Sequence, residues 1–269
     1  MVLMKLVDAV VILYNPNLDI LLKNIQILSQ QVRTVYLIDN SSVELLTTDF
    51  TPFNNVRYHF NDENLGIAEA QNIGILLAKE QGADYITLFD QDSDVTDNFI
   101  DGLLSSFDIA AKHNIKLACV GPRVVDIFTD SEVKPLIQKE GVKIQSLTLC
   151  SQIIASGKMI DINVLNQIGM MESQLFIDGV DHEWCWRAKK YGYATAINEK
   201  VKMVHQLGEA RKRFLGIPYK VSSPIRLYYQ FRNILILSRR NYVPNYWKVR
   251  NLLAIPVRYV ILSLVDKHS

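Results

Sequence analysis

The sequence has few features of secreted, disulfide-stabilised or membrane-spanning proteins. It has only three cysteines, Cys119, Cys150 and Cys185, and none has the CxxC spacing of a zinc or redox site. The first residues, MVLMKLVDAVVILYN, lack the charged start, long apolar run and cleavage site of a signal peptide. No repeat or low-complexity linker divides the chain. We therefore expect one main domain with reduced thiols in a cytoplasmic location.

Charge is unevenly distributed along a chain whose net charge is only +1. Residues 1–199 hold 15 Lys and Arg against 26 Asp and Glu, a net of −11; residues 200–269 hold 14 against 2, a net of +12. The basic end is expected either to meet an anionic group, such as a diphosphate or a membrane surface, or to neutralise the acidic body. We expect no nucleic-acid partner.

Apolar runs alternate with amphipathic stretches, as expected of an α/β sheet with helical crossovers. Five runs predict strands, at 8–14, 34–40, 56–60, 85–90 and 117–125. Three stretches predict helices, at 18–31, 66–82 and 181–192. In open α/β sheets, ligands bind beyond the carboxyl ends of the strands. The first four predicted strands each end in polar residues, so the sequence predicts a nucleotide cleft there.

The absence of a glycine-rich loop bearing Lys or Arg after the first strand disfavours a nucleotidyltransferase, since YNPN stands at that point. The third and fourth strand exits carry more informative groups. Asn64 and Gly66 open a helix whose N-terminus favours negative charge and leaves backbone N–H groups available. Asp90 and Asp92 are two residues apart on an extended segment, so both can address one ligand set.

The ordered series VVILYNP, LIDNSS, NLGIAEAQNIG and LFDQDS resembles the family 2 glycosyltransferases of GT-A fold, and most of all the bacterial rhamnosyltransferases. The resemblance continues through FIDGVDHEWCWRAKKYGY and MVHQLGE to YYQFRN. It implies a Rossmann-like mixed sheet flanked by helices. The catalytic domain would cover residues 1–235, and residues 236–269 would form a basic, amphipathic, helical C-terminal segment.

The resemblance also implies roles for the strand-exit residues. Asp92 would be the direct ligand of Mg²⁺ or Mn²⁺, which prefer oxygen ligands and stabilise charge on a departing nucleoside diphosphate. Asp90 would lie nearer the ribose or a metal-bound water. Asp39 would accept from the N3–H of uracil or thymine. The remaining donor-binding candidates are Tyr14, Asn15, Gln91, Asn64 and Gly66.

An inverting transferase needs a base that takes the proton of the acceptor hydroxyl. Aligning Cys185 and Arg187 with the family pattern puts this base at Asp181, although Val180 stands where the family usually has Glu. Asp178 remains an alternative base, with Asp181 as a helix cap. Glu183 is four residues before Arg187 and can pair with it.

Three later residues are candidates for the metal and the diphosphate. By resemblance His205 approaches the metal or diphosphate, and imidazole is a better ligand for Mn²⁺ than for Mg²⁺. Arg211 and Arg213 follow in a basic run that can close on the diphosphate or can be a solvated surface.

Residues 236–269 interleave aromatic and apolar residues with arginines and lysines. The run LLAIPVRYVILSLV is too short and too interrupted to predict a transmembrane helix. A helix lying peripherally on the inner, anionic face of the cell membrane is one interpretation, and a helix packed on the catalytic body or on a second subunit is the other.

The predicted function is inverting, metal-dependent transfer of a sugar to a glycan acceptor, one carried on a lipid diphosphate, in bacterial surface polysaccharide (O-antigen) synthesis. By resemblance the donor is dTDP-rhamnose. The alternatives are another UDP- or dTDP-sugar donor, or a decayed sugar-nucleotide-binding protein. The sequence leaves the oligomeric state open.

Overall fold

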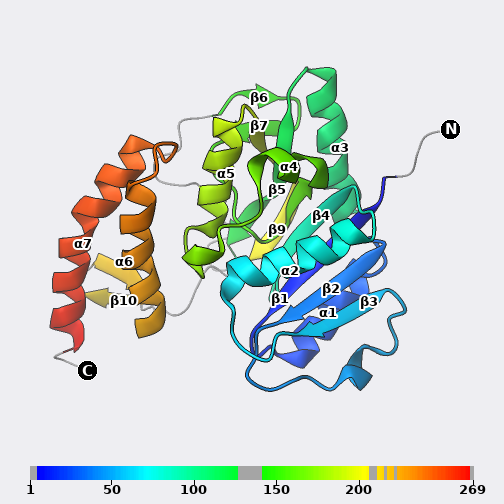
Figure 1. Ribbon diagram of the computed structural model, residues 1–269, viewed down its shortest axis with the longest axis horizontal. Helices are drawn as coiled ribbons and strands as arrows, with labels where there is room; N and C mark the ends of the chain where they lie inside the picture. Colours follow the sequence, from blue (N-terminus) through cyan, green and yellow to red (C-terminus); the bar gives the residue numbers. More distant parts are fainter. Residues whose placement is uncertain (1–4, 127–140, 206–210, 215–216, 221–222, 267–269) are drawn as a thin grey trace.

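A mixed sheet of nine strands forms the centre of the protein (Figure 1). The computed structural model describes residues 5–126, 141–205, 211–214, 217–220 and 223–266. The strand order is β3-β2-β1-β4-β8-β5-β9-β7-β6. Their bounds are β1 Val7–Leu13, β2 Thr34–Asp39, β3 Val56–Phe60, β4 Tyr85–Asp90, β5 Leu117–Asp126, β6 Lys143–Ile144, β7 Leu147–Cys150, β8 Lys158–Asp161 and β9 Ala194–His205.

The first four strands are parallel and contain the predicted apolar runs. β1 is buried along its whole length, as expected of a strand covered on both faces. Asp8 is fully buried within it and forms an ion pair with Arg33 at 2.6 Å. The parallel arrangement brings Leu13, Asp39 and Asp90 to the same edge of the sheet, because Leu13 pairs with Asp39 and Ile12 with Asp90. The predicted cleft position follows from this register.

Helices cover both faces of the sheet, and each face has its own hydrophobic core (Figure 1). α1 and α3 pack on one face, while α2, α4 and α5 pack on the other. Asn17 caps α1, which buries Leu21, Ile25 and Leu28 at helical spacing. The helix bounds are α1 Leu18–Leu28, α2 Gly66–Glu80, α3 Phe99–Lys112, α4 Leu165–Ile168 and α5 Val180–Lys190; 3₁₀ turns lie at Thr47–Phe50, Ile162–Val164 and Ser173–Leu175.

The second half of the sheet was less predictable from the sequence. β8 runs antiparallel between β4 and β5, and β9 pairs in parallel with β5 and antiparallel with β7. The β5–β9 register shifts twice, so these strands lack an uninterrupted period of two. β10 (Arg211–Phe214) and β11 (Ile217–Lys220) form a separate hairpin.

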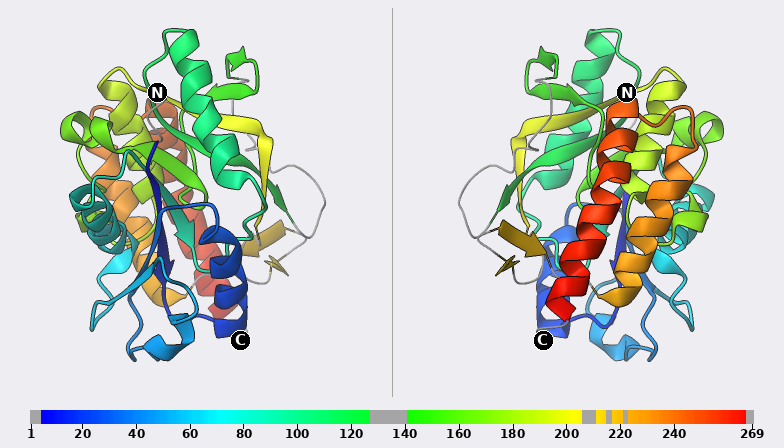
Figure 2. Two further views of the ribbon diagram at one scale, coloured as in Figure 1. Left: turned by 90° about the vertical axis from the view of Figure 1, so that its right-hand side faces the viewer. Right: turned by 90° about the vertical axis from the view of Figure 1, so that its left-hand side faces the viewer.

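Two long helices, α6 (Pro224–Ser238) and α7 (Asn245–Asp266), close the described chain and lie side by side (Figure 2). α6 continues through residue 235, the predicted domain boundary, and its residues Asn233, Ile234 and Leu237 are buried. Among the described residues, no helix is both long enough and apolar enough to cross a membrane.

Candidate active site

Carboxylates from two distant parts of the chain interact electrostatically near the end of β4. Asp90 is the last residue of β4, and Asp92 is exposed in the turn that follows. Burial raises the pKa of Asp90 to about 7, and the negative charges of Asp181 and Asp92 add to this rise. The positive charges of Arg226 and Lys158 oppose it. The structure therefore places Asp90 within electrostatic reach of Asp181 on α5.

The turn after β4 is held by serine hydroxyls. The Asp90 N–H donates to Ser93 Oγ at 3.1 Å, and the Ser93 N–H donates to the Asp90 carbonyl at 3.1 Å. Ser93 also hydrogen-bonds Ser156, which lies two residues before β8. These bonds fix the turn that carries Asp92. Asp94 is exposed, and the following helix, α3, begins only after Asn98, so Asp94 is a solvated loop carboxylate and not its N-cap.

Asp181 forms an ion pair with a lysine that the sequence analysis did not identify. Lys158 Nζ lies 3.2 Å from Asp181 Oδ1, and the Lys158 side chain is completely buried, whereas that of Asp181 is 27% exposed. Burial is the largest single influence and lowers the pKa of Lys158, but the carboxylate of Asp181 and the thiols of Cys185 and Cys119 together raise that pKa above its usual value. Lys158 therefore stays protonated beneath the Asp181 carboxylate.

Asp178, the alternative base, has a different partner. Arg226 of α6 donates from Nε and Nη2 to its two carboxylate oxygens, each at 3.0 Å. Asp178 has a positive φ of 65°, as does Phe176 with 62°, and Gly179 follows with 88°. The segment before α5 is thus tightly turned, and Arg226 holds Asp178 toward α6. Asp181 pairs with Lys158 instead.

Asn233, in the YYQFRN motif, clamps the same segment. Its Nδ2 donates to the carbonyls of Leu175, Ile177 and Asp178 at 2.7–2.8 Å. Tyr229 stacks on Phe176 with ring centroids 4.4 Å apart. This motif therefore positions the start of α5 from outside. The motif itself was visible in the sequence, but its contacts across more than 50 residues were not.

Glu183, Arg187 and the two tryptophans of α5 have structural roles. Glu183 is 1% exposed and accepts from Arg187 at 2.8 Å, which confirms the predicted i,i+4 pair, and from Tyr242 Oη at 2.6 Å. Trp184 and Trp186 are 0% and 2% exposed and belong to the core. A carboxylate enclosed in this way has no open side for an acceptor.

The residues after β1 and β2 lie at the same strand-exit edge as those after β4. The Tyr14 N–H donates to Gln91 Oε1 at 2.7 Å, and Gln91 Nε2 donates to the Tyr14 carbonyl at 3.2 Å. The Asn15 N–H donates to Ser41 Oγ at 2.7 Å. The structure therefore brings Tyr14, Asn15 and Gln91 together, as the cleft hypothesis requires, and leaves the Tyr14 side chain 54% exposed.

Asp39 is also at this edge but is fully buried. Its Oδ1 accepts from the Ser41 N–H and its Oδ2 from Tyr58 Oη, both at 2.8 Å. Burial raises the pKa of Tyr58, and the hydrogen bond to Asp39 raises it further. Because no surface of Asp39 is open, contact with a nucleotide base requires the covering side chains to move.

The start of α2 uses its backbone donors within the protein. Asn64 Oδ1 accepts from the Gly66 N–H at 3.0 Å, and the Ala68 N–H donates to the Phe176 carbonyl at 3.3 Å. Gly66 has a φ of +82°, and a Cβ there would lie 2.5 Å from the Phe176 ring. The close approach at Gly66 is therefore to Phe176, and the predicted supply of free N–H groups is reduced.

The metal candidates are only partly described. His205 ends β9 and Arg211 and Arg213 lie on β10, but their side chains are outside the described part of the chain. Within that part, no group of three His, Cys, Asp or Glu is arranged to hold a metal ion. Asp90 and Asp92 offer two carboxylates on one turn, which fits Mg²⁺ bound by one or two carboxylates together with substrate phosphates.

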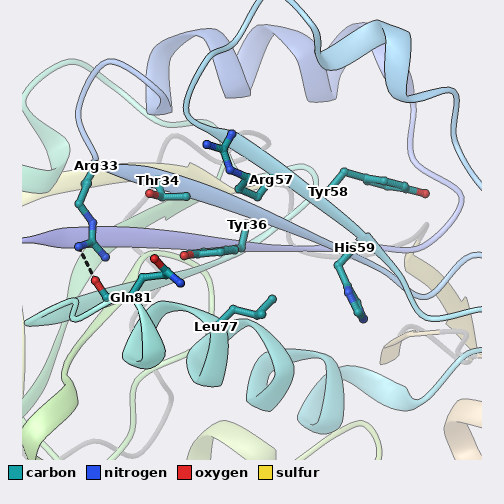
Figure 3. A pocket seen from close by; sticks show the side chains of 8 residues that line it. All are labelled: Arg33, Thr34, Tyr36, Arg57, Tyr58, His59, Leu77 and Gln81. Atoms are coloured by element: carbon teal, nitrogen blue, oxygen red, sulfur yellow. Dashed lines mark hydrogen bonds between the residues drawn. The ribbon is translucent and has the colours of Figure 1, made fainter.

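A cavity of about 520 Å³ lies away from this acidic cluster, between α2 and the edge of the sheet (Figure 3). Arg33 in its wall already binds Asp8 and donates to the Gln81 carbonyl at 2.8 Å. Its lining contains no predicted site residue; it consists of Arg33, Thr34, Tyr36, Arg57, Tyr58, His59, Leu77 and Gln81. We therefore place the candidate active site at the strand exits.

Comparison with known proteins adds independent information. The profile of Glycosyl transferase family 2 matches residues 8–148. The dTDP-rhamnosyl transferase RfbF of Shigella flexneri is 36% identical over 266 residues, which cover 96% of this chain and 85% of that protein. The second match extends through Asp181 and into α7.

Two solved structures share the fold. GalNAc-T7, crystallised with UDP, GalNAc and Mn²⁺, superposes with a TM-score of 0.62 at 15% identity, covering 98% of this chain and 58% of that one. TarS residues 1–349 of S. aureus, in complex with UDP, give a TM-score of 0.51 at 13% identity, covering 93% and 70%. At these identities the likeness shows the fold alone, which is the predicted GT-A fold.

Proposed function

The chain belongs to glycosyl transferase family 2 and is a glycosyltransferase resembling the rhamnosyltransferases, and from this premise we propose that it transfers rhamnose from dTDP-rhamnose to a glycan acceptor. The observation that carries the donor assignment is the 36% identity to a dTDP-rhamnosyl transferase along 96% of the chain. The acidic cluster supplies the groups that such a reaction needs.

In the proposed mechanism Asp181 accepts the proton of the acceptor hydroxyl. The hydroxyl oxygen then bonds to the anomeric carbon of the donor sugar as the bond from that carbon to the diphosphate oxygen breaks. The products are the glycoside, with inverted configuration, and dTDP. Asp181 is suited to this role because its side chain is 27% exposed and Lys158 binds one of its oxygens, whereas Arg226 binds both oxygens of Asp178 and Glu183 is enclosed.

Asp92, with His205, would hold a divalent cation on the donor diphosphate, and Asp90 would lie nearer the ribose or a metal-bound water. When bound, Mg²⁺ or Mn²⁺ supplies stabilisation of the negative charge that develops on the leaving group. Tyr14, Asn15 and Gln91, joined by hydrogen bonds at the neighbouring strand exits, would line the nucleoside side of the donor site. Asp39 would reach the base after Tyr58 moves. Asn64 and Gly66 would shape the entry to α2.

Calorimetry with a panel of sugar nucleotides tests the donor assignment. In the presence of Mn²⁺ we expect dTDP-rhamnose to bind at least ~10-fold more tightly than UDP-glucose, a difference of about 1.4 kcal/mol. We also expect slow release of free rhamnose without acceptor. Asp92→Ala is the matched variant, and it should abolish the Mn²⁺ dependence. Tighter binding of a UDP-sugar would contradict the assignment of dTDP-rhamnose as donor. Binding without turnover of any sugar nucleotide would indicate a decayed enzyme.

We further propose that the acceptor is lipid-linked, in bacterial surface polysaccharide synthesis, and that α7 lies on an anionic membrane. The inner side of α7 packs on the body, where the Trp247 ring contacts the Trp186 ring edge-on at 5.1 Å. Its outer side exposes apolar side chains at helical spacing: Tyr246 48%, Val249 56%, Leu253 68% and Val257 59%. An exposed apolar face of this kind marks a contact with a membrane or with another protein.

The flanking charges favour a membrane over a second subunit as the occupant. Lys248, Arg250 and Arg258 are on α7, and no Asp or Glu occurs between residues 210 and 265. Each Lys or Arg near an anionic lipid surface contributes about 1 kcal/mol, and two copies of such a face would instead repel one another. A peripheral position would bring the acceptor lipid to the enzyme.

A further inference from the structure

Lys158 occupies a position where a charged side chain is costly. It is on β8, between β4 and β5 in the sheet, and its side chain is completely buried. Ile160 is two residues later and on the same face of the strand, and it belongs to the hydrophobic core that also contains the buried residues of α5. Lys158 Nζ also lies 5.7 Å from the centre of the buried Trp184 ring. A lysine is almost never fully buried without a partner.

The partner in the structure is Asp181. Lys158 Nζ donates to Oδ1 at 3.2 Å, and the Asp181 side chain is 27% exposed, so part of the carboxylate stays accessible to solvent. A buried ion pair of this kind adds little stability compared with apolar residues of similar volume. A gain in stability therefore does not explain why a lysine is buried here. A role in holding Asp181 does explain it, because the Lys158 ammonium is fixed in the sheet and binds one oxygen of that carboxylate.

We propose that Lys158 is a positioning residue for transfer: it anchors Asp181 through Oδ1, so that the other oxygen faces the acceptor. This inference rests on the proposed function, in which Asp181 is the base. Lys158 does not touch the substrate in this account. Its effect on transfer passes entirely through Asp181.

A double-mutant cycle on transfer tests this dependence. Lys158→Met keeps the apolar stem and removes the charge, and the Asp181 left behind can be solvated, so we expect folded protein. In the wild-type background kcat should fall by about 10-fold to 100-fold, which does not exceed the ~10²–10⁴-fold contribution of the base itself. The KM for the sugar nucleotide should stay within about two-fold. In the Asp181→Asn background Lys158→Met should change the residual rate by less than about two-fold.

The outcomes separate the two hypotheses. Full transfer by Asp181→Asn would remove the proposed base, and the inference with it. A strong loss in Asp181→Asn, together with either no loss in Lys158→Met or an equal loss in both backgrounds, would overturn the positioning role alone. If Lys158→Met does not fold, Lys158→Gln takes its place in the same cycle. The double variant contains neither charge of the buried pair, so it should melt at a higher temperature than Asp181→Asn.

Discussion

At the residue scale, three carboxylates near the start of α5 are only a few positions apart in sequence, but the structure gives each a different environment. Asp178 is paired with Arg226 of α6, Asp181 with the buried Lys158, and Glu183 with Arg187 and Tyr242 inside the core. The three carboxylate groups are chemically alike, so their neighbours set their different properties. The motif left open whether Asp181 or Asp178 is the base. In the structure the two differ in their ion-pair partners, Lys158 and Arg226.

Asp181→Asn and Asp178→Asn should separate the base from its neighbour. We expect Asp181→Asn to lose ~10²–10⁴-fold in kcat with donor affinity close to wild type, because the proton acceptor is removed while the strand exits stay intact. Its amide can still accept from Lys158, but the buried ammonium loses its counter-charge, at a cost of about 1–3 kcal/mol. Rates with saturating donor, calorimetry and thermal melts give the three readouts.

Asp178→Asn is the matched control. Its ion pair with Arg226 is partly exposed, so we expect a small loss of stability, below about 1 kcal/mol, and a transfer rate within ten-fold of wild type. A reversal, with Asp178→Asn inactive and Asp181→Asn active, would move the base three residues earlier. It would also imply that Arg226 releases Asp178 during the reaction.

At the element scale, α7 has one face that packs on the protein and one face that is exposed. The inner face packs on α5 and α6, and the outer face is apolar and exposed over several turns. The two interpretations drawn from the sequence, a packed helix and a membrane-surface helix, apply to different faces of the same helix. Substitutions on the outer face can therefore test membrane contact without disturbing the inner contacts.

Leu253→Glu with Val257→Glu should release the protein from anionic vesicles. Two exposed side chains would lose their contact with lipid, and two negative charges would be added, so we expect partitioning onto phosphatidylglycerol vesicles to fall by at least about 10-fold. Leu76→Glu, on the exposed side of α2, is the matched control because it adds charge away from α7. Sedimentation with vesicles measures both. Equal binding of all three proteins would contradict the membrane proposal.

At the scale of the whole molecule, the basic end of the chain is anchored to the acidic body. Tyr242 donates to Glu183, Val243 is 2% exposed, and Trp247 contacts Trp186. Arg240 pairs with Glu172 at 3.2 Å. The segment after residue 235 thus contributes to the core around α5. The boundary predicted after residue 235 falls within α6, and Leu237 and Val243 beyond it belong to the same hydrophobic core as α5.

Two truncations locate the point where the catalytic body ends. A chain ending at Arg240 loses the Tyr242 hydrogen bond and the packing of Val243 and Trp247, so we expect it to be less stable by about 3–5 kcal/mol and to lose donor binding on warming. A chain ending at Asn251 keeps all three contacts and should stay within about 1 kcal/mol of the full chain. Thermal melts compare them, and coinciding midpoints for both truncations would show that these contacts add nothing.

The sequence alone determined those features that depend on short-range pattern. Continuous apolar runs made β1, β2 and β4 recognisable, because strands buried on both faces need no alternation. Ordered motifs identified the family, and the parallel register then required Asp39 and Asp90 to share one edge of the sheet. Glu183 and Arg187 could be paired because helical spacing is local.

Only the tertiary structure decided which groups surround the candidate base. Lys158 is the first residue of the short strand β8, whose sequence has no catalytic pattern of its own. No local feature shows that its side chain contacts Asp181, 23 residues later. Arg226 and Asn233 reach the start of α5 from a helix about 50 residues away. Such contacts depend on how β8, α5 and α6 pack together, and packing joins residues whose separation along the chain carries no periodic signal.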